Sequence, residues 1–128
     1  MQNPVTSELI LKETSFQIIA AAFEVHNILG FGFLENVYQK ALVHELLVRC
    51  LKVEAQKEIK VSYKGVEVGS YYADILVNDE VILELKSVEA LTKIHEAQLL
   101  KYLKGTGLRL GFIINFGKSK VEYKRMVL

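Results

Sequence analysis

The chain has 128 residues, of which 51% are hydrophobic and 24% charged, and its formal net charge is +1. We expect residues 1–128 to form one domain around a single core, and the composition excludes a disordered chain. The near-neutral charge gives no whole-molecule attraction for a polyanion, so any nucleic-acid binding must come from local patches.

We expect neither membrane insertion nor secretion. The longest apolar stretch, residues 16–25, is interrupted by polar side chains and falls far short of the ~20 residues of a membrane span. No signal peptide or anchor is visible, and Cys50 has no second cysteine to pair with. The sequence therefore predicts a cytoplasmic protein with a buried, inert thiol.

Hydrophobic periodicity predicts two N-terminal helices. The secondary structure of residues 1–13 is ambiguous: Asn3-Pro4 is typical of a loop, and the residues that follow could begin a helix or a short strand. The first clear helix runs from Thr14, as N-cap, to Leu29, where Gly30 ends it. A second helix over residues 34–51 carries apolar side chains at three- and four-residue spacing, as a core-facing stripe does.

The apolar period then changes to two, which indicates a sheet. Strands are predicted over residues 53–61, 66–77 and 80–88, followed by a helix over 91–104 and strands over 108–116 and 121–128. A strand, a helix and a strand in succession form a crossover, so strands 80–88 and 108–116 should run parallel. We therefore expect an α/β (α+β) fold of order α-α-β-β-β-α-β-β, with a mixed sheet flanked by helices.

Charged residues interrupt two of the predicted strands. Glu84 and Lys86 share one face of their strand, and Asp74 interrupts the preceding one. A two-residue loop would turn Asp74 away from Glu84, whereas a three-residue loop, 78–80, places the two opposite each other. The second register is favoured because it also gathers an apolar face, which consists of Ala73, Ile75, Val77, Val81, Leu83 and Leu85.

Two chemical interpretations fit these charges. Facing carboxylates with a lysine two residues along suit a hard cation such as Mg²⁺, with the lysine contacting a water or a phosphate. A structural ion pair of Lys86 with Asp74 or Glu84 fits the same pattern. The pattern alone does not choose between them.

The helices carry further candidates. Glu35 suits either a site acid or a first-turn residue favoured by the helix dipole. We expect Gln98 and Tyr102 to be half-buried on the sheet-facing side of the third helix. Lys101 and Lys104 belong to a basic cluster that would also suit a solvated face.

For three aromatic or imidazole side chains, the sequence allows either a structural or a functional role. His26 and His95 suit either a shared cleft or a satisfied core or edge position. Tyr38, three residues after Glu35, fits a core or supporting position better than a catalytic one.

Taken together, these segments resemble a known family. Residues 32–38, Gly-Phe-Leu-Glu-Asn-Val-Tyr, resemble the motif of the GxxExxY protein family, and the likeness continues through residues 73–74, 84–86, 98–102 and 111–117. That family looks like a branch of the PD-(D/E)xK nuclease superfamily, which implies a restriction-endonuclease-like core. Ala73 stands where proline often precedes the aspartate. Since proline is not a ligand, this departure spares the chemistry.

The resemblance implies a Mg²⁺- or Mn²⁺-dependent nuclease acting on DNA. It assigns the metal to Asp74 and Glu84, with the Leu85 carbonyl and Glu35 completing the shell, and makes Lys86 the catalytic lysine. The substrate contacts would be Gln98, Tyr102, Lys101 and Lys104. Two alternatives are a non-catalytic nucleic-acid-binding or protein-interaction module on the same fold, and a junction-resolving endonuclease, which would require a homodimer.

Overall fold

The computed structural model describes the backbone of residues 4–128 and the side chains of residues 11–128. Within this part the elements are α1 (Pro4–Leu29), α2 (Glu35–Val48), β1 (Val53–Tyr63), β2 (Val66–Val77), β3 (Val81–Lys86), α3 (Lys93–Thr106), β4 (Leu110–Asn115) and β5 (Glu122–Val127). The predicted order is confirmed. Of the loop expected at Asn3-Pro4, Asn3 lies outside the described residues, and the prediction is wrong for Pro4, which begins α1.

The first helix begins earlier than predicted. α1 starts at Pro4, so the N-cap expected at Thr14 is wrong. Proline suits the first turn of a helix, where its missing N–H would have had no helical partner. Thr14 lies within α1, is buried, and its Oγ1 accepts a hydrogen bond from Asn78 Nδ2 at 3.5 Å. Packing against the loop after β2, rather than capping, accounts for this threonine.

The strands form one mixed sheet in the order β1-β2-β3-β4-β5. β3 and β4 run parallel on either side of the α3 crossover, and the other neighbours are antiparallel. β2 pairs with β3 as Ile75↔Leu83 and Val77↔Val81, which leaves residues 78–80 as the connection. The predicted three-residue loop is therefore confirmed.

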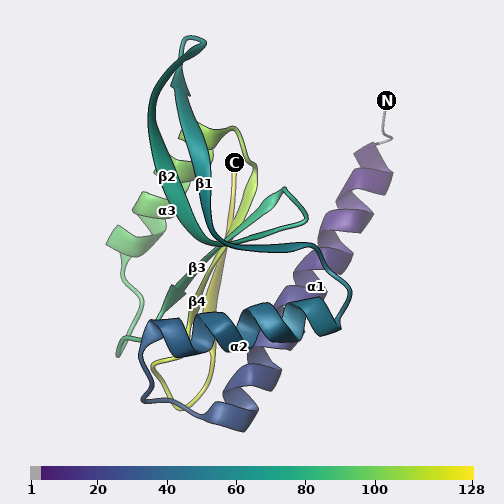
Figure 1. Cartoon of the computed structure of the whole chain (residues 1–128), viewed down its shortest axis with the longest axis vertical. Coiled ribbons are helices and arrows are strands. Elements are labelled where there is room, and N and C mark those ends of the chain that lie inside the picture. Colours follow the sequence, from purple (N-terminus) through teal and green to yellow (C-terminus); the bar gives the residue numbers. More distant parts are fainter. Residues whose placement is uncertain (1–3) are drawn as a thin grey trace.

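Helices cover both faces of the sheet, with α1 and α2 on one side and α3 on the other (Figure 1). Beneath α1 and α2, residues such as Tyr38, Leu42 and Leu83 form the larger core cluster. Beneath α3, a smaller cluster is built around Leu99 and Leu103. The sheet thus separates two apolar layers.

One residue departs from the predicted apolar face. Ala73 packs in the α3-side cluster, whereas Ile75, two residues on, packs in the opposite cluster. Regular alternation would place both on one face. The β1–β2 ladder is irregular here, because Ala55↔Ile75 and Lys57↔Ala73 are paired while Gln56 between them has a φ of 50°. The side chains of β2 thus change faces beside Asp74, at the position where the β1–β2 ladder lacks a Gln56–Asp74 pair.

The cysteine also departs from its prediction. α2 ends at Val48 rather than near residue 51, so Cys50 lies in the turn beyond the helix, with a φ of 65°. Its side chain is exposed. The buried thiol predicted from helical periodicity is therefore wrong, because that periodicity does not extend to this position.

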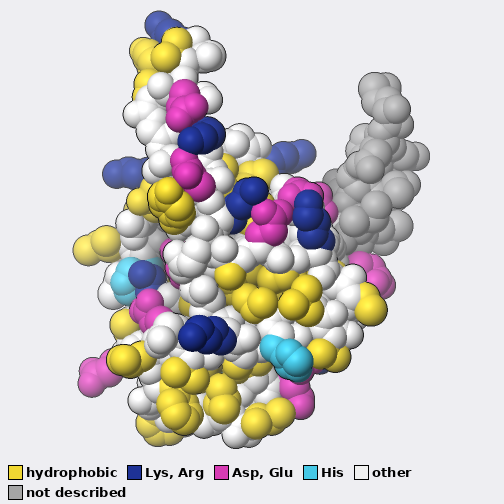
Figure 2. Space-filling model, viewed as in Figure 1, with side chains coloured by type: hydrophobic (Ala, Val, Ile, Leu, Met, Phe, Trp, Pro, Cys, Tyr) yellow, Lys and Arg dark blue, Asp and Glu magenta, His cyan; other side chains and the backbone are white. Residues whose placement is uncertain are grey.

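β1 and β2 continue beyond the sheet as a long hairpin (Figure 1). Its turn, Lys64-Gly65, has φ values of 49° and 80°, as a tight hairpin requires. Charges of both signs follow the hairpin, and Lys60 pairs with Glu58 and Glu67 (Figure 2). The hairpin is therefore not a basic arm.

Among the described residues, no helix combines the length and apolar character needed to cross a membrane.

Candidate active site

Asp74 and Glu84 lie where β2 and β3 separate. The β2–β3 ladder runs as far as Ile75↔Leu83, and the next residues in this register are Asp74 and Glu84. Beyond this pair the Leu85 N–H donates to a side chain of β2 rather than to its backbone, because Asp74 Oδ2 accepts the hydrogen bond at 2.8 Å. The Asp74 carboxylate is thereby fixed against β3, one residue from Glu84.

Glu84 is held in a setting that disfavours its charge. Burial raises the pKa of Glu84 from 4.5 to about 7; Lys86 and a hydrogen bond from the Asp74 backbone lower this pKa, and Glu35 raises it. Its Oε1 is shielded from solvent and has no hydrogen-bond partner among the described residues. Because an unpaired buried oxygen is costly, this atom marks a place for a proton or a cation.

Lys86 follows Glu84 on the same face of β3 and is half-buried. Among the side chains of residues 11–128, no ion pair within 4.0 Å joins Lys86 to Asp74 or to Glu84. Lys86 still lowers the pKa of Glu84 through its charge. The direct ion pair, the structural alternative for these residues, is thus not formed in the part of the chain described.

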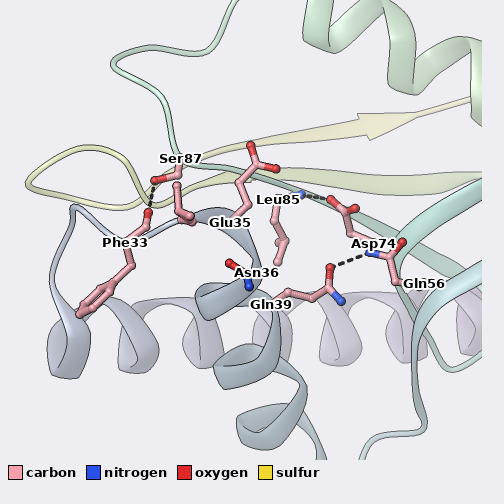
Figure 3. Close-up of a pocket in the computed structure, with 9 residues that line it drawn as sticks. Phe33, Glu35, Asn36, Gln39, Gln56, Asp74, Leu85 and Ser87 are labelled. Carbon is pink, nitrogen blue, oxygen red and sulfur yellow. Dashed lines mark hydrogen bonds between the residues drawn. The ribbon is translucent and has the colours of Figure 1, made fainter.

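A cavity of about 500 Å³ opens beside Asp74. It is lined by Phe33, Leu34, Glu35, Asn36, Gln39, Gln56, Asp74, Leu85 and Ser87 (Figure 3). The first turn of α2 therefore meets β2 at Asp74 and the end of β3, so that Glu35 and Asp74 line the same cavity. Glu84 and Lys86 are not among the lining residues, although the charge of Glu35 reaches Glu84 and raises its pKa.

Tyr38 holds the turn between α1 and α2, which positions Glu35 beside this cavity. The ring is fully buried and stacks on Phe116 at 4.6 Å. The Tyr38 hydroxyl donates to the Gly30 carbonyl at 2.6 Å and accepts from the Phe33 N–H at 3.3 Å. Tyr38 thus has the core and supporting position expected for it. It holds the turn that precedes Glu35, the first residue of α2.

A buried asparagine holds the chain just beyond β3. Asn115 is fully buried, and its Oδ1 accepts from the Val88 and Gly117 N–H groups, both at 3.0 Å. Its Nδ2 donates to the Val88 carbonyl at 3.0 Å. On the other side, Ser87 Oγ donates to the Phe33 carbonyl at 2.8 Å. The exit of β3 is therefore tied both to β4 and to the α1–α2 turn.

The two histidine candidates lie outside the cavity lining, and each makes a hydrogen bond to the backbone. His26 is buried against Phe116, and its Nε2–H donates to the Lys118 carbonyl at 2.8 Å. His95 Nδ1 accepts from the Thr92 N–H at 3.3 Å, within the capping box of α3. Neither histidine lines the cavity. The satisfied core or edge position is the one that the structure gives both of them.

The α3 candidates lie apart from the cavity lining. Tyr102 is half-buried and stacks on Tyr71 at 3.7 Å, whereas Gln98 is exposed, so the predicted half-buried position is wrong for Gln98. The buried face of α3 is formed by Leu99 and Leu103, which turns Gln98 outward. Gln98 Nε2 still donates to the Tyr102 hydroxyl at 3.5 Å. Two further candidates on this helix, Lys101 and Lys104, are exposed.

Sequence reasoning missed four polar lining residues: Asn36, Gln39, Gln56 and Ser87. Gln39 lies one helical turn after Glu35, so the four-residue spacing along α2 was an available signal. Gln56 lines the cavity from a backbone conformation with a positive φ of 50°, which the pattern of polar and apolar side chains does not predict.

The donor set fits a hard divalent cation. Among the residues that the structure describes, no three His, Cys, Asp or Glu side chains gather as a ready metal site. Asp74 and Glu84 nevertheless offer carboxylate oxygens on adjacent strands, and the orphaned Glu84 Oε1 lacks the partner that a cation would supply. Ions that prefer oxygen ligands accept carbonyls and waters alongside two carboxylates.

Comparison with known proteins adds one finding. A family model described as the PD-(D/E)XK nuclease superfamily matches residues 12–126 of the chain. The match runs from α1 into β5 and includes every candidate residue above. A search of curated proteins finds no match.

Proposed function

Because the chain belongs to the PD-(D/E)XK nuclease superfamily, we propose that it is a Mg²⁺- or Mn²⁺-dependent nuclease that hydrolyses DNA phosphodiester bonds. Nucleases of this superfamily generally use divalent metals and act on nucleic acid. One observation carries the proposal: Asp74 is fixed against the Leu85 amide, beside a Glu84 carboxyl whose Oε1 has no partner. We further propose membership of the GxxExxY branch, from Gly32, Glu35 and Tyr38.

The proposed metal ligands are Asp74, Glu84 and the Leu85 carbonyl, with Glu35 acting directly or through a water. A bound ion would polarise the scissile phosphate and lower the pKa of the attacking water. The hydrogen bond from the Leu85 amide fixes the Asp74 carboxylate against β3. The high pKa of Glu84 means that it must release a proton before it can serve as a ligand.

Lys86 is proposed to orient the attacking water or to stabilise charge developing on the phosphate. Its position two residues after Glu84, on the same face of β3 and free of a close ion pair among residues 11–128, supports this role. The proposed substrate contacts are Gln98, Tyr102, Lys101 and Lys104.

Cleavage of labelled DNA in Mg²⁺, in Mn²⁺ and in EDTA tests the proposal. Glu84→Gln keeps the side-chain shape and removes a charged ligand, so cleavage should fall by a factor on the order of 10² or more. Glu89→Gln removes an exposed carboxylate just beyond β3 and serves as the matched control. Cleavage that survives EDTA, or that is equal in the parent and Glu84→Gln, would defeat the proposal.

One observation favours a second candidate. The cavity beside Asp74 is lined without Glu84 and Lys86, as would suit a non-catalytic nucleic-acid-binding or protein-interaction module. Calorimetric titration with Mg²⁺ separates the two functions. A nuclease should bind the ion with an affinity that Glu84→Gln weakens, whereas the module should bind DNA without cleaving it and without responding to Mg²⁺.

A further inference from the structure

The cavity beside Asp74 is lined by amides rather than by cations. α2 contributes Asn36 and Gln39, β1 contributes Gln56, and no Lys or Arg side chain appears in the lining that the structure describes. This part of the cavity therefore offers a phosphate no positive side chain. Uncharged donors and acceptors instead suit the edge of a nucleobase, since amide side chains match base edges in pairs of hydrogen bonds.

Gln39 and Gln56 form a hydrogen-bonded pair in which both donor and acceptor groups stay free. Gln56 Nε2 donates to Gln39 Oε1 at 2.8 Å, across the space between β1 and α2 (Figure 3). Among the described residues, neither side chain makes another hydrogen bond. The Gln39 NH₂ group and the Gln56 carbonyl oxygen have no partner among the described residues, and exchanging oxygen and nitrogen in both amides would move the free donor to Gln56 and the free acceptor to Gln39. In either orientation the hydrogen-bonded pair offers a donor and an acceptor at the cavity wall.

The backbone at Gln56 brings this pair to Asp74. Gln56 has a φ of 50°, which is uncommon for a residue with a side chain and clusters at functional sites. Its ladder partner would be Asp74, because the flanking pairs are Ala55↔Ile75 and Lys57↔Ala73. The break in the ladder thus places the amide pair and the proposed metal ligand at one point of the sheet.

Apolar side chains line the same cavity. Leu34 is 78% exposed and Phe33 is 45% exposed, which is high for large hydrophobic residues. Apolar contact with the face of a base, combined with hydrogen bonds to its edge, is how proteins bind bases that are out of the helical stack. The Phe33 ring points away from the amide pair (Figure 3) and packs edge-on against Tyr38, so Leu34 is the exposed apolar lining residue that complements the pair.

We propose that the Gln39–Gln56 pair binds the Watson–Crick edge of an unpaired DNA base next to the scissile phosphate. This inference rests on the proposed nuclease function for the position of that phosphate. Every base carries a donor and an acceptor side by side on this edge, and pairing occupies them in a duplex. The pair therefore recognises the unpaired state rather than base identity, and the substrate class is single-stranded, flapped or gapped DNA.

Binding in Ca²⁺ tests the inference without turnover. The probes are a labelled single strand, the same strand with abasic positions, and the corresponding duplex, and fluorescence anisotropy gives each Kd. The parent should bind the intact single strand at least tenfold more tightly than the abasic strand or the duplex. Gln39→Ala and Gln56→Gly should each reduce this preference by a factor of about ten and leave duplex affinity unchanged.

The variants are chosen to keep the fold. Alanine suits a helix, and glycine adopts the left-handed backbone of Gln56 without steric cost. The matched controls are His44→Ala, exposed on α2, and Lys64→Gly, at a φ of 49° in the hairpin turn. Gln39→Glu, at almost constant volume, leaves only acceptors at this position and so removes the donor that Gln39 supplies either to a base or to Gln56; it should therefore also remove the preference.

Each outcome decides between proposals. Equal loss of affinity for all three probes, or a preference that survives Gln39→Glu, overturns the base contact. Cleavage of the same probes in Mg²⁺ keeps the two proposals apart. A Gln39-dependent preference in binding without cleavage by the parent defeats the nuclease proposal alone, whereas cleavage that ignores Gln39 and Gln56 defeats the base contact alone.

Discussion

Neutralising Glu84 should change how the stability of the metal-free protein depends on pH. Burial raises the pKa of Glu84 from 4.5 to about 7 in the folded state, whereas unfolding returns the carboxyl to water and to its ordinary pKa. Between these two values the folded protein holds a proton that the unfolded chain has released. Glu84→Gln keeps the shape of the side chain and cannot ionise, so it removes this difference.

The sign and magnitude follow from proton linkage. A carboxyl whose folded pKa is raised stabilises the fold fully below pH 4.5, and this contribution is lost as the pH rises through about 7. At 1.36 kcal/mol per pKa unit, the loss in the free energy of unfolding is about 3 kcal/mol. The Glu84→Gln variant should escape this loss and be the more stable protein at about pH 8.

Urea unfolding in EDTA, followed by circular dichroism between about pH 4 and pH 8, measures both proteins under the same conditions. Glu89→Gln controls for the removal of an exposed carboxylate. Adding Mg²⁺ at about pH 8 should restore stability to the parent and not to Glu84→Gln, because an ion that binds only the folded state stabilises it. Parallel pH profiles for the parent and Glu84→Gln would refute the reasoning.

Three further predictions concern residues around the site. Lys86→Ala should retain Mg²⁺ binding by calorimetry but slow DNA cleavage by a factor on the order of 10², and unchanged turnover would remove Lys86 from the mechanism. Gly117→Ala should cost about 1–3 kcal/mol or more in urea unfolding, because its Cβ would lie 2.3 Å from backbone atoms after β3, whereas Gly69→Ala meets nothing within 4 Å and should not. Cys50 is exposed, so iodoacetamide should alkylate it in the native protein nearly as fast as in urea; strong protection would contradict this.

The arrangement of the central strands could be predicted because charge and alternation constrain it together. Only a three-residue loop sets Asp74 opposite Glu84 while keeping Leu83 on the apolar face, and the observed β2–β3 register agrees. The position of Ala73 could not be predicted, because it depends on the ladder break at Gln56. Hydrophobic periodicity does not predict a positive φ at a glutamine.

Helix ends were predicted less well than strands, and tertiary packing explains why. α1 continues through Thr14, which is buried beside Asn78 rather than used as a cap. α2 ends before Cys50, which exposes a thiol that the apolar pattern assigns to the core. On α3, the face with Leu99 and Leu103 takes the buried positions, so that Gln98 is turned outward.

The proposed site depends on acids from separate layers being held in fixed relation. Glu35 belongs to α2, whereas Asp74 and Glu84 belong to the sheet. The link is the hydrogen bond from Ser87 to the Phe33 carbonyl, since it joins the chain just after β3 to the turn before α2. Tyr38 holds the same turn from within the core, and Asn115 holds the far side of the β3 exit. These contacts hold the elements that carry the proposed acids, and acids held in place limit the reorganisation that binding of a metal or substrate would otherwise cost.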